Sequence, residues 1–404
     1  MRVLHIITGL AAGGAEQQLR LLLRHLPARC DVVTLTNPGA VAHGIRSDGI
    51  RVDHLKMGGN RDLSALPRLV RTIRSGRYDL VHTHLYRACV FGRTAARLAG
   101  VRAVLATEHS LGETRIEGRP LTPGTRALYL ATERLGSGTV AVSATVADRL
   151  RAWGVPSGRI HLVPNGIDAR NFRFDPAART AARTRLGLPE RAFVVGGVGR
   201  LVPGKRFDVL LRAVAGLPSA RLLLVGDGPE RAALRALADR LGVADRVQLL
   251  GERDGAVAAM SDGPAEIPGL LAAMDVLVSP SEEEAFGLAV IEALAAGLPV
   301  LHVTCPALDE LPGADAPGAR RVALDPAALT DALRELAAAG QGRLPVPAAV
   351  RRYDIARSAD RLMALYERTA ARRTRTRPPA PAPPPPRDPY TPHDHAIAVP
   401  DPKR

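Results

Sequence analysis

The sequence predicts an α/β protein of two domains, each built on a parallel sheet. Apolar, β-branched runs recur along the 404 residues and alternate with segments that carry apolar residues at helical spacing. A chain of this length can form two domains of ordinary size, each burying its own core. Residues 275–301 show the repeating unit most clearly: an apolar run at 276–278, a loop, a helical segment at 286–296 and a second run at 300–303.

The composition is that of a globular protein, with 46% hydrophobic and 24% charged residues. No apolar run approaches the roughly 20 residues that a membrane-spanning helix needs. The start, Met1 to Thr8, enters a strand directly and lacks the shape of a signal peptide. Cys30, Cys89 and Cys305 form neither a disulfide framework nor a zinc-binding spacing. We therefore expect a cytoplasmic protein.

The formal net charge of +15 is concentrated in the first part of the chain. Residues 1–165 carry 23 Arg or Lys and 11 Asp or Glu, whereas residues 166–370 carry 25 and 26. A basic first half indicates an anionic partner: phosphate groups, an acidic membrane face or nucleic acid. Nucleic acid is disfavoured, because aromatic residues, on which unpaired bases stack, make up 3% of the chain.

The first domain opens with a buried strand, Val3 to Thr8, and a glycine loop that leads into a helix from Gln17 to Leu26. Such a loop is a phosphate or sugar site in many α/β proteins, although a plain tight turn would use the same residues. The dinucleotide fingerprint Gly-x-Gly-x-x-Gly is absent, because three residues separate Gly9 from Gly13. A nucleotide-dependent oxidoreductase is therefore disfavoured.

Histidines mark two later strands of the first domain. His82 and His84 alternate on one face of a strand at 79–84; they could bind a metal ion, but no third ligand lies nearby in the sequence, so we favour a structural or acceptor-side role. His109 follows a strand at 103–107, at the carboxyl end where α/β proteins gather their sites, although a plain surface histidine would fit the position too. Residues 111–125 lack periodicity and fit an acceptor loop or a surface excursion alike. Further strands are predicted at 31–35, 51–55 and 139–143. Further helices are predicted at 63–75 and 92–98, and two more are predicted to end at residues 135 and 153.

Two cations stand near the start of the second domain. Arg200 ends a glycine-rich strand that begins at Phe193, and Lys205 lies in the turn before a helix that ends at Val214. Both side chains and the helix N-terminus would converge on one anion, although a surface turn would use the same residues. Lys205 is the single lysine between residues 166 and 370, in a chain where three of 55 basic residues are Lys.

Two carboxylates frame the loop after the strand at 276–278. Glu284 precedes the helical segment and Glu292 lies a turn or two inside it. A ligand at the carboxyl end of the strand would meet both, together with the free N–H groups of the helix start, which Gly287 leaves accessible. A carboxylate accepts from two neighbouring hydroxyls at once, as on ribose or a sugar ring. Two bare glutamates would indicate a solvated helix face, but the flanking strand, loop and glycine favour a site.

Several segments resemble the family 4 retaining glycosyltransferases. Glu284-Ala-Phe-Gly-Leu-Ala-Val-Ile-Glu292 is similar to the E-x7-E motif of that family, and the match continues to Val300. Similar segments occur in the order of the family at Gly13-Gly14-Ala15-Glu16, at Val163-Pro-Asn-Gly-Ile-Asp168 and at Gly199-Arg200-Leu201-x-x-x-Lys205-x-x-Asp208. Arg206 departs from the family, where glycine is commonest, and Thr304-Cys305-Pro306 stands where the family has a Gly-Gly loop that faces the donor, which leaves sugar specificity open.

The resemblance implies the GT-B fold, in which two doubly wound Rossmann-like domains face each other across a cleft. The implied divisions are an acceptor domain 1–168, a link 169–190, a donor domain 191–350 and a crossover helix 351–371 that packs back on the first domain. Residues 254–268 form an irregular segment longer than the family usually carries. The tail, 372–404, holds 11 of the 33 prolines and few apolar residues, which predicts disorder.

The resemblance also implies roles for individual residues. Glu292 would bind the ribose of the nucleotide, Glu284 would orient the transferred sugar, and His109 would reach the donor sugar. Arg200 and Lys205 would hold the diphosphate, and these two cations, with His109 and Glu284, form the predicted catalytic set. The remaining predicted donor-binding residues are Gly13, Gly14, Gly251, Phe286, Gly287 and Leu288.

The predicted reaction moves a hexose from a nucleotide-diphosphate sugar to a hydroxyl of a glycan or lipid-linked acceptor, with retention of configuration. No Asp-x-Asp metal motif is well placed and two fixed cations can stabilise the departing diphosphate, so we expect no required metal and no cofactor beyond the donor substrate. The basic first domain fits peripheral association with the inner face of the cell membrane. The alternative is a non-enzymatic basic protein that binds anionic membrane surfaces or nucleotides.

Overall fold

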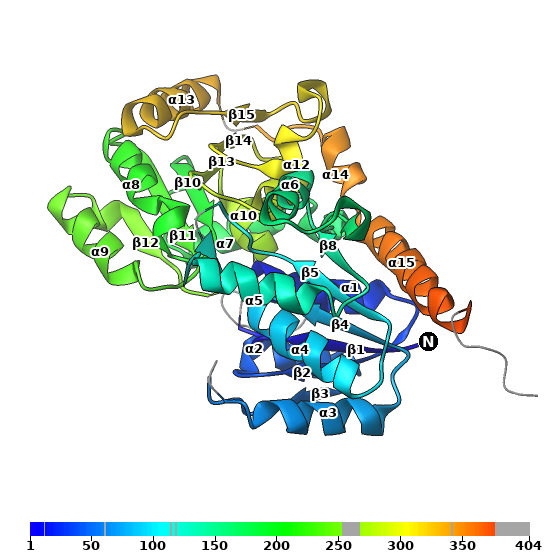
Figure 1. Cartoon of the computed structure of the whole chain (residues 1–404). Helices are drawn as coiled ribbons and strands as arrows, with labels where there is room; N and C mark the ends of the chain where they lie inside the picture. Colours follow the sequence, from blue (N-terminus) through cyan, green and yellow to red (C-terminus); the bar gives the residue numbers. More distant parts are fainter. Residues whose placement is uncertain are drawn as a thin grey trace, which may run out of the picture.

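The computed structural model describes residues 1–11, 13–59, 62–113, 115–117, 119–252, 267–340 and 342–375. The chain forms two α/β domains, one above the other in Figure 1. The predicted insertion at 254–268 lies outside the described residues except for its last two positions, which belong to a helix. Most of the predicted disordered tail lies outside them as well.

The first domain is built on a seven-stranded sheet in the order β3-β2-β1-β4-β5-β8-β9, in which every pairing is parallel. The central strands are buried along nearly their whole length, as expected of a parallel sheet covered by helices on both faces. Its strands are β1 (Arg2–Ile7), β2 (Arg29–Thr34), β3 (Val52–His54), β4 (Leu80–His84), β5 (Val104–Glu108), β8 (Gly138–Ala141) and β9 (Ile160–Leu162). A short antiparallel hairpin, β6 (Arg115–Ile116) and β7 (Arg119–Pro120), leaves the sheet after β5.

The helices of the first domain largely follow the prediction. The sequence missed α2 and the first two turns of α4, which begins at Tyr86 rather than at Gly92. The first helix starts at Gly14, so the glycine loop after β1 supplies its N-terminus. The helices are α1 (Gly14–His25), α2 (Gly39–Ser47), α3 (Ala65–Gly76), α4 (Tyr86–Leu98), α5 (Pro123–Glu133), α6 (Ala144–Trp153) and the 3-10 turn η1 (Ser157–Arg159).

The second domain is built on a six-stranded parallel sheet in the order β12-β11-β10-β13-β14-β15. Its strands are β10 (Phe193–Val198), β11 (Ala220–Val225), β12 (Val247–Leu249), β13 (Val276–Ser279), β14 (Val300–His302) and β15 (Ala319–Arg321). Its helices and 3-10 turns are η3 (Pro203–Lys205), α8 (Phe207–Ala215), α9 (Arg231–Arg240), η4 (Ala244–Arg246), α10 (Ile267–Ala273), α11 (Leu288–Ala295), α12 (Pro306–Asp309), η5 (Gly313–Asp315), α13 (Pro326–Ala339) and α14 (Ala348–Arg352).

The segment between the domains is itself structured, with η2 (Ala169–Phe172) and α7 (Pro176–Arg185). Helix α7 is fixed to the second domain by charge. Arg179 and Arg183 donate to the two carboxylate oxygens of buried Asp275 at 2.6 and 2.7 Å. Because two guanidinium groups satisfy one carboxylate, this buried charge is paired on both sides.

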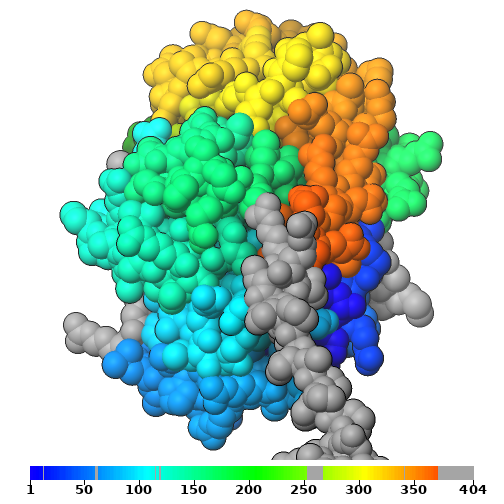
Figure 2. Space-filling view, turned by 45° about the vertical axis from the view of Figure 1, so that its right-hand side comes forward, coloured from blue at the N-terminus to red at the C-terminus, as the bar shows by residue number. Residues whose placement is uncertain are grey.

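The last helix, α15 (Ile355–Arg375), returns to the first domain and ends beyond the predicted limit at residue 371. Figure 2 shows it, in orange and red, descending from the second domain onto the blue N-terminal residues. Its inner face packs with Val3, Leu80 and Leu105 of the first sheet through residues that include Leu362 and Tyr366. The predicted crossover helix therefore packs on the first domain through a shared hydrophobic cluster.

The sheet topology places both sets of predicted site residues. In each sheet the strand order reverses beside the first strand, between β1 and β4 and between β10 and β13. Ligands of open α/β sheets bind outside the carboxyl ends of the strands at such a point. The loops after β1, β10 and β13 carry Gly13, Lys205 and Glu284, and His109 follows β5, the neighbour of β4.

Candidate active site

A cavity of about 580 Å³ lies between the two domains. Its wall contains every predicted site residue except Gly251: Gly13, Gly14, His109, Arg200, Lys205, Glu284, Phe286, Gly287, Leu288 and Glu292. Gly251 instead forms a β-bridge with Gly226 at a φ of +75°, and the next residue, Glu252, reaches the wall. The cavity thus joins residues from both domains and from both switch points.

Arg200 and Lys205 enter the cavity from the loop after β10. Gly199 has a φ of +151°, which turns the chain out of the strand so that Arg200 is exposed at the wall. Lys205 ends the 3-10 turn η3, and its Nζ donates to Oε1 of Glu284 in an ion pair that is mostly shielded from solvent. The predicted cation and the predicted sugar-orienting carboxylate therefore touch each other.

The loop after β13 is shaped by Gly287. This residue caps α11 at its N-terminus with a φ of +104°, and a Cβ at this position would lie 2.5 Å from Sγ of buried Cys305. Any other residue would therefore be both strained and crowded here. The helix starts at Leu288, so the N-terminus of α11, with the positive end of its helix dipole, opens on the cavity.

Glu292 lies one turn inside α11 and lines the cavity. Burial raises the pKa of its carboxyl group to about 7. Because a carboxylate away from water is costly unless it is hydrogen-bonded or paired, Glu292 is prepared to accept hydrogen bonds from a ligand.

The N-terminus of α1 faces α11 across the cavity. A Cβ on Gly14 would lie 3.6 Å from Cδ1 of Leu288, so the starts of the two helices meet where the domains approach. Burial raises the pKa of Glu16, in the first turn of α1, to about 7, while the charge of Arg200 acts in the opposite direction. The positive N-termini of α1 and α11 thus act on the same part of the cavity.

Four described residues between positions 111 and 117 form part of the cavity wall, so this part of the predicted segment 111–125 is not a surface excursion. Leu111, Gly112, Arg115 and Glu117 line it. The backbone N–H of Glu113 donates to Oε1 of Glu283 at 3.2 Å, which connects this segment to the second domain.

Arg149 connects the same segment to the loop of the second domain that carries Glu284. Its Nη1 donates to the backbone carbonyl of Leu111 at 2.8 Å and to that of Glu284 at 3.2 Å. The hairpin segment is therefore held against the loop that carries Glu284.

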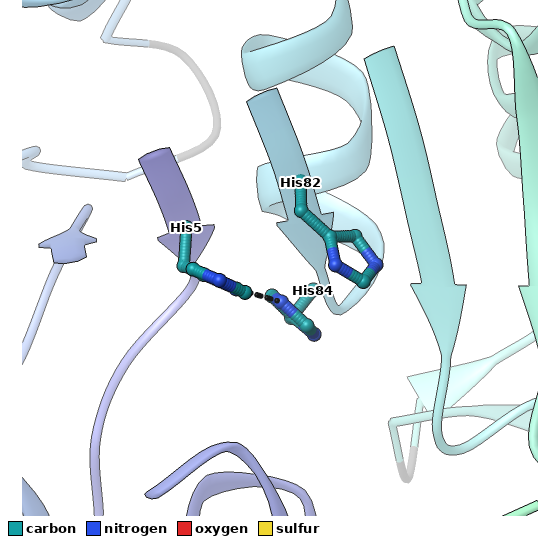
Figure 3. A group of neighbouring side chains, drawn as sticks. All are labelled: His5, His82 and His84. Atoms are coloured by element: carbon teal, nitrogen blue, oxygen red, sulfur yellow. Dashed lines mark hydrogen bonds between the residues drawn. The ribbon is translucent and has the colours of Figure 1, made fainter. Parts of the chain in front are cut away.

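Three histidines of the first domain, His5, His82 and His84, form a buried cluster (Figure 3). No third ligand lies near His82 and His84 in the sequence, but one does in space, because β1 lies beside β4 and brings His5 next to them. One nitrogen from each of the three rings lies within 4.8 Å of the others, and the three side chains are fully buried. His109, at the end of β5, extends the cluster to the cavity.

Gln18 and Asn165 are among the cavity residues that were not predicted as site residues. Gln18 is 2% exposed, and neither atom of its amide has a hydrogen-bond partner among the described residues. Asn165, within the Val163-to-Asp168 segment, is also buried in the wall. Gln18 lies four residues after Gly14 and therefore on the same face of α1. This spacing indicates a site only weakly, because polar residues on a surface helix usually face solvent.

The sequence matches known families over both domains. Residues 12–171 match the family described as Glycosyltransferase Family 4, and residues 192–339 match Glycosyl transferases group 1. The D-inositol 3-phosphate glycosyltransferase 1 of Catenulispora acidiphila is 32% identical over 323 residues, which cover 72% of this chain and 73% of that protein. The chain belongs to glycosyltransferase family 4. This is a family of retaining enzymes that use nucleotide sugars, and the match gives no support to a non-enzymatic binder.

Other relatives match over less of their length. The D-inositol 3-phosphate glycosyltransferase of Salinispora tropica is 32% identical over 315 residues, or 71% of this chain and 60% of that protein. The one from Streptomyces avermitilis is 36% identical over 293 residues, or 65% and 59%. The chain thus spans about 60% of the length of several of the curated relatives it matches.

The solved structures show that this family 4 chain has the GT-B fold. Anabaena Alr3699/HepE in complex with UDP superposes with a TM-score of 0.75 at 22% identity, covering 91% of this chain and all of that one. The glycosyltransferase WaaG, involved in lipopolysaccharide biosynthesis, gives a TM-score of 0.61 at 19% identity over 91% and 98%. Among the described residues of the family 4 chain, no helix has the length and apolar character to cross a membrane.

Proposed function

We propose that the protein transfers a sugar from a nucleotide-diphosphate sugar to a hydroxyl group of a glycan or lipid-linked acceptor, with retention of configuration. The observation that carries this proposal is the second-domain wall of the cavity. Two cations, Arg200 and Lys205, and two carboxylates, Glu284 and Glu292, reach one cavity from the loops beside β10 and β13. This arrangement can neutralise a diphosphate and hold sugar hydroxyls at the same time.

The two cations would act on the leaving group. In the rate-limiting step the bond between the sugar and the diphosphate breaks, and negative charge grows on the diphosphate. Arg200, Lys205 and the N-terminus of α11 are fixed where this charge would form, so they need little reorganisation during the reaction. Their fixed positive charge supports a reaction without a required metal ion.

The two carboxylates would bind neutral parts of the donor. Glu292 would accept hydrogen bonds from the two ribose hydroxyls. Glu284 would orient the transferred sugar, and its ion pair with Lys205 holds that carboxylate beside the diphosphate position. His109 would contact the sugar from the first domain.

The acceptor would bind to the first domain. The curated relatives are named for D-inositol 3-phosphate, a polyol that carries a phosphate group. Arg115 and Arg149 in the first-domain part of the wall suit an acceptor with such a group. The charge of the first 165 residues supports a peripheral position at the inner face of the membrane, where a lipid-linked acceptor would be found.

Release of nucleotide tests the proposal. Purified protein would be incubated with UDP-, GDP- and ADP-sugars, with and without membrane extract, in the presence of EDTA. We expect turnover of one nucleotide class, and in Lys205→Ala a loss of rate of about 100- to 1,000-fold with an unchanged unfolding temperature.

Arg212→Ala is the matched control, because Arg212 is an exposed cation on α8 outside the cavity wall. It should keep the rate of the unaltered protein. If Lys205→Ala kept most of the activity, the assignment of the diphosphate would be wrong. Full loss of activity in EDTA would remove the metal-free mechanism.

A further inference from the structure

Three histidines of the first domain form a hydrogen-bonded chain that runs from the protein core to the cavity. Nδ1 of His5 lies 3.0 Å from Nε2 of His84, the contact drawn as a dashed line in Figure 3. Nδ1 of His84 lies 3.1 Å from Nε2 of His109. His5 and His84 are fully buried, whereas His109 is 8% exposed and forms part of the cavity wall. The chain therefore has a closed end at His5 and an end at the cavity.

The three rings are neutral near pH 7. Burial lowers the pKa of His5 to about 3 and that of His109 to about 4, and it lowers the pKa of His84 well below its ordinary value. A neutral imidazole has one N–H donor and one acceptor nitrogen. Three such rings carry three protons, of which two lie in the two hydrogen bonds. The third proton must therefore lie at one end of the chain, either on Nε2 of His5 or on Nδ1 of His109.

The surroundings of the two ends decide between these arrangements. Neither end nitrogen has a hydrogen-bond partner among the described residues. A buried N–H without a partner is rarer in proteins than a buried acceptor without one. Both end nitrogens are shielded from solvent, but His5 lies in the core away from the cavity, whereas the ring of His109 forms part of the cavity wall. The end at His109 is therefore the one next to a space that a ligand can occupy. The acceptor nitrogen therefore belongs at His5 and the N–H at His109.

We propose that His5 and His84 are positioning residues that fix His109 as the Nδ1–H tautomer, so that His109 donates a hydrogen bond to a hydroxyl oxygen of the bound sugar. In this arrangement Nδ1–H of His5 donates to His84, and Nδ1–H of His84 donates to Nε2 of His109. The proposal rests on the proposed function for the identity of the ligand. The direction of the hydrogen bonds does not depend on that function.

A metal ion would be a different use of the same cluster. His5, His82 and His84 could provide three nitrogen ligands, but the group found among the described residues contains no carboxylate to balance a buried divalent charge. Both ring nitrogens of His82 are already engaged, with the hydroxyl of Tyr366 at 2.5 Å and that of Thr107 at 2.7 Å. These contacts favour a neutral hydrogen-bonded network.

The tautomer can be measured directly in the free protein. Two-bond 1H–15N correlation spectra of protein labelled with 15N-histidine distinguish the protonated from the unprotonated ring nitrogen, and the signals of His109 are assigned by their loss in His109→Phe. We expect His109 and His84 to carry the proton on Nδ1. A proton on Nε2 of His109 would overturn the proposal, and so would one equivalent of zinc bound to the purified protein and lost in His84→Leu.

Activity tests the consequence. His84→Leu removes the donor to His109, so the tautomer should become mixed and kcat/KM for the donor should fall roughly tenfold, the size expected for one neutral hydrogen bond. Tyr366→Phe is the matched control, because it removes a hydroxyl that bonds to His82, outside the three-histidine chain, and keeps the ring that lies 6.4 Å from that of His5. It should leave both the His109 signals and kcat/KM unchanged.

The outcomes separate the two proposals. An active protein whose His84→Leu variant is folded and equally active would overturn the role of the chain while the glycosyltransferase function stands. A protein without activity on any nucleotide sugar would remove the proposed function, and the spectra would still decide the tautomer.

Discussion

The two walls of the cavity differ in how they handle polar groups. The second-domain wall carries charged side chains that are partly exposed, with Lys205 and Glu284 paired to each other. The first-domain wall also has charged residues, Arg115, Glu117 and Arg149, but its His109 is supported by His5 and His84, which are neutral and fully buried. A charged side chain costs little free energy where solvent or a counter-ion is close, whereas deep burial favours neutral groups joined by hydrogen bonds.

The difference matches the parts of a nucleotide sugar that each wall would meet. A diphosphate is anionic and needs cations, which the second domain provides at the carboxyl end of β10. A sugar is neutral and needs oriented donors and acceptors, which neutral imidazoles supply without a cost in desolvated charge. We therefore expect the second domain to neutralise the diphosphate, whereas both domains would contact hydroxyl groups, through Glu284 and Glu292 in the second domain and His109 in the first.

The largest expected difference between the two walls concerns the unfolding free energy at acid pH. His5 has a pKa of about 3 in the folded protein against an ordinary value of 6.5, so between these values the unfolded chain binds one more proton than the folded one. Its contribution to stability is therefore lost as the pH falls below about 6.5, by about 1.4 kcal/mol per pH unit. His5→Leu should lower the slope of the unfolding free energy against pH by that amount between pH 6 and pH 5.

Urea unfolding at pH 7, 6 and 5 measures these slopes. Tyr366→Phe is the control, since its hydroxyl does not titrate in this range, and its slope should equal that of the unaltered protein. Equal slopes for His5→Leu and the unaltered protein would mean that His5 is not held neutral by burial.

A smaller effect is expected from Glu292 on donor binding. Its pKa of about 7 means that it is protonated, and a poorer acceptor for ribose hydroxyls, as the pH falls through 7. The donor KM should therefore rise several-fold between pH 8 and pH 6, up to about tenfold per unit at the limit. In Glu292→Gln the KM should be higher throughout and lose most of this dependence on pH.

Glu16 also has a pKa of about 7 and provides the comparison variant. Glu16→Gln should keep the dependence on pH that Glu292 causes. If Glu292→Gln and the unaltered protein gave parallel KM profiles, Glu292 would not contact the donor.

The smallest effect concerns Arg206, which follows Lys205. It occupies the left-handed region at a φ of +50°, which explains why glycine is common at this position in the family. Its ion pairs with Asp208 and Glu282 are partly exposed and contribute little. Arg206→Gly should therefore be more stable than Arg206→Ala by about 1 kcal/mol, as measured by thermal unfolding. Equal stabilities would show that the backbone at this position is not strained.

The second-domain wall could be predicted from the sequence because its residues are local. Arg200 and Lys205 lie in one turn, and Glu284 and Glu292 lie in one loop and helix start, so the spacing along the chain fixes their relative positions. Gly287 was predicted for the same reason, and the structure adds the physical requirement, a left-handed backbone against Cys305.

The first-domain wall needed the tertiary structure. His5 and His84 are 79 residues apart and meet because β1 pairs with β4 rather than with β2 alone. Periodicity within a strand shows which side chains share a face, but it does not show which strand lies next to it. The same holds for the ion pair between Lys205 and Glu284 and for the hydrogen bond from the backbone N–H of Glu113 to Glu283.

The sequence by itself determined the two α/β domains, the charged residues of the second-domain wall and the family, because each depends on short-range patterns of apolar, glycine and charged residues. The tertiary structure alone decided the order of the strands, the meeting of the helix starts across the cavity and the histidine chain. These depend on which distant segments pack together, and that choice is made by burial of the whole core rather than by any local pattern.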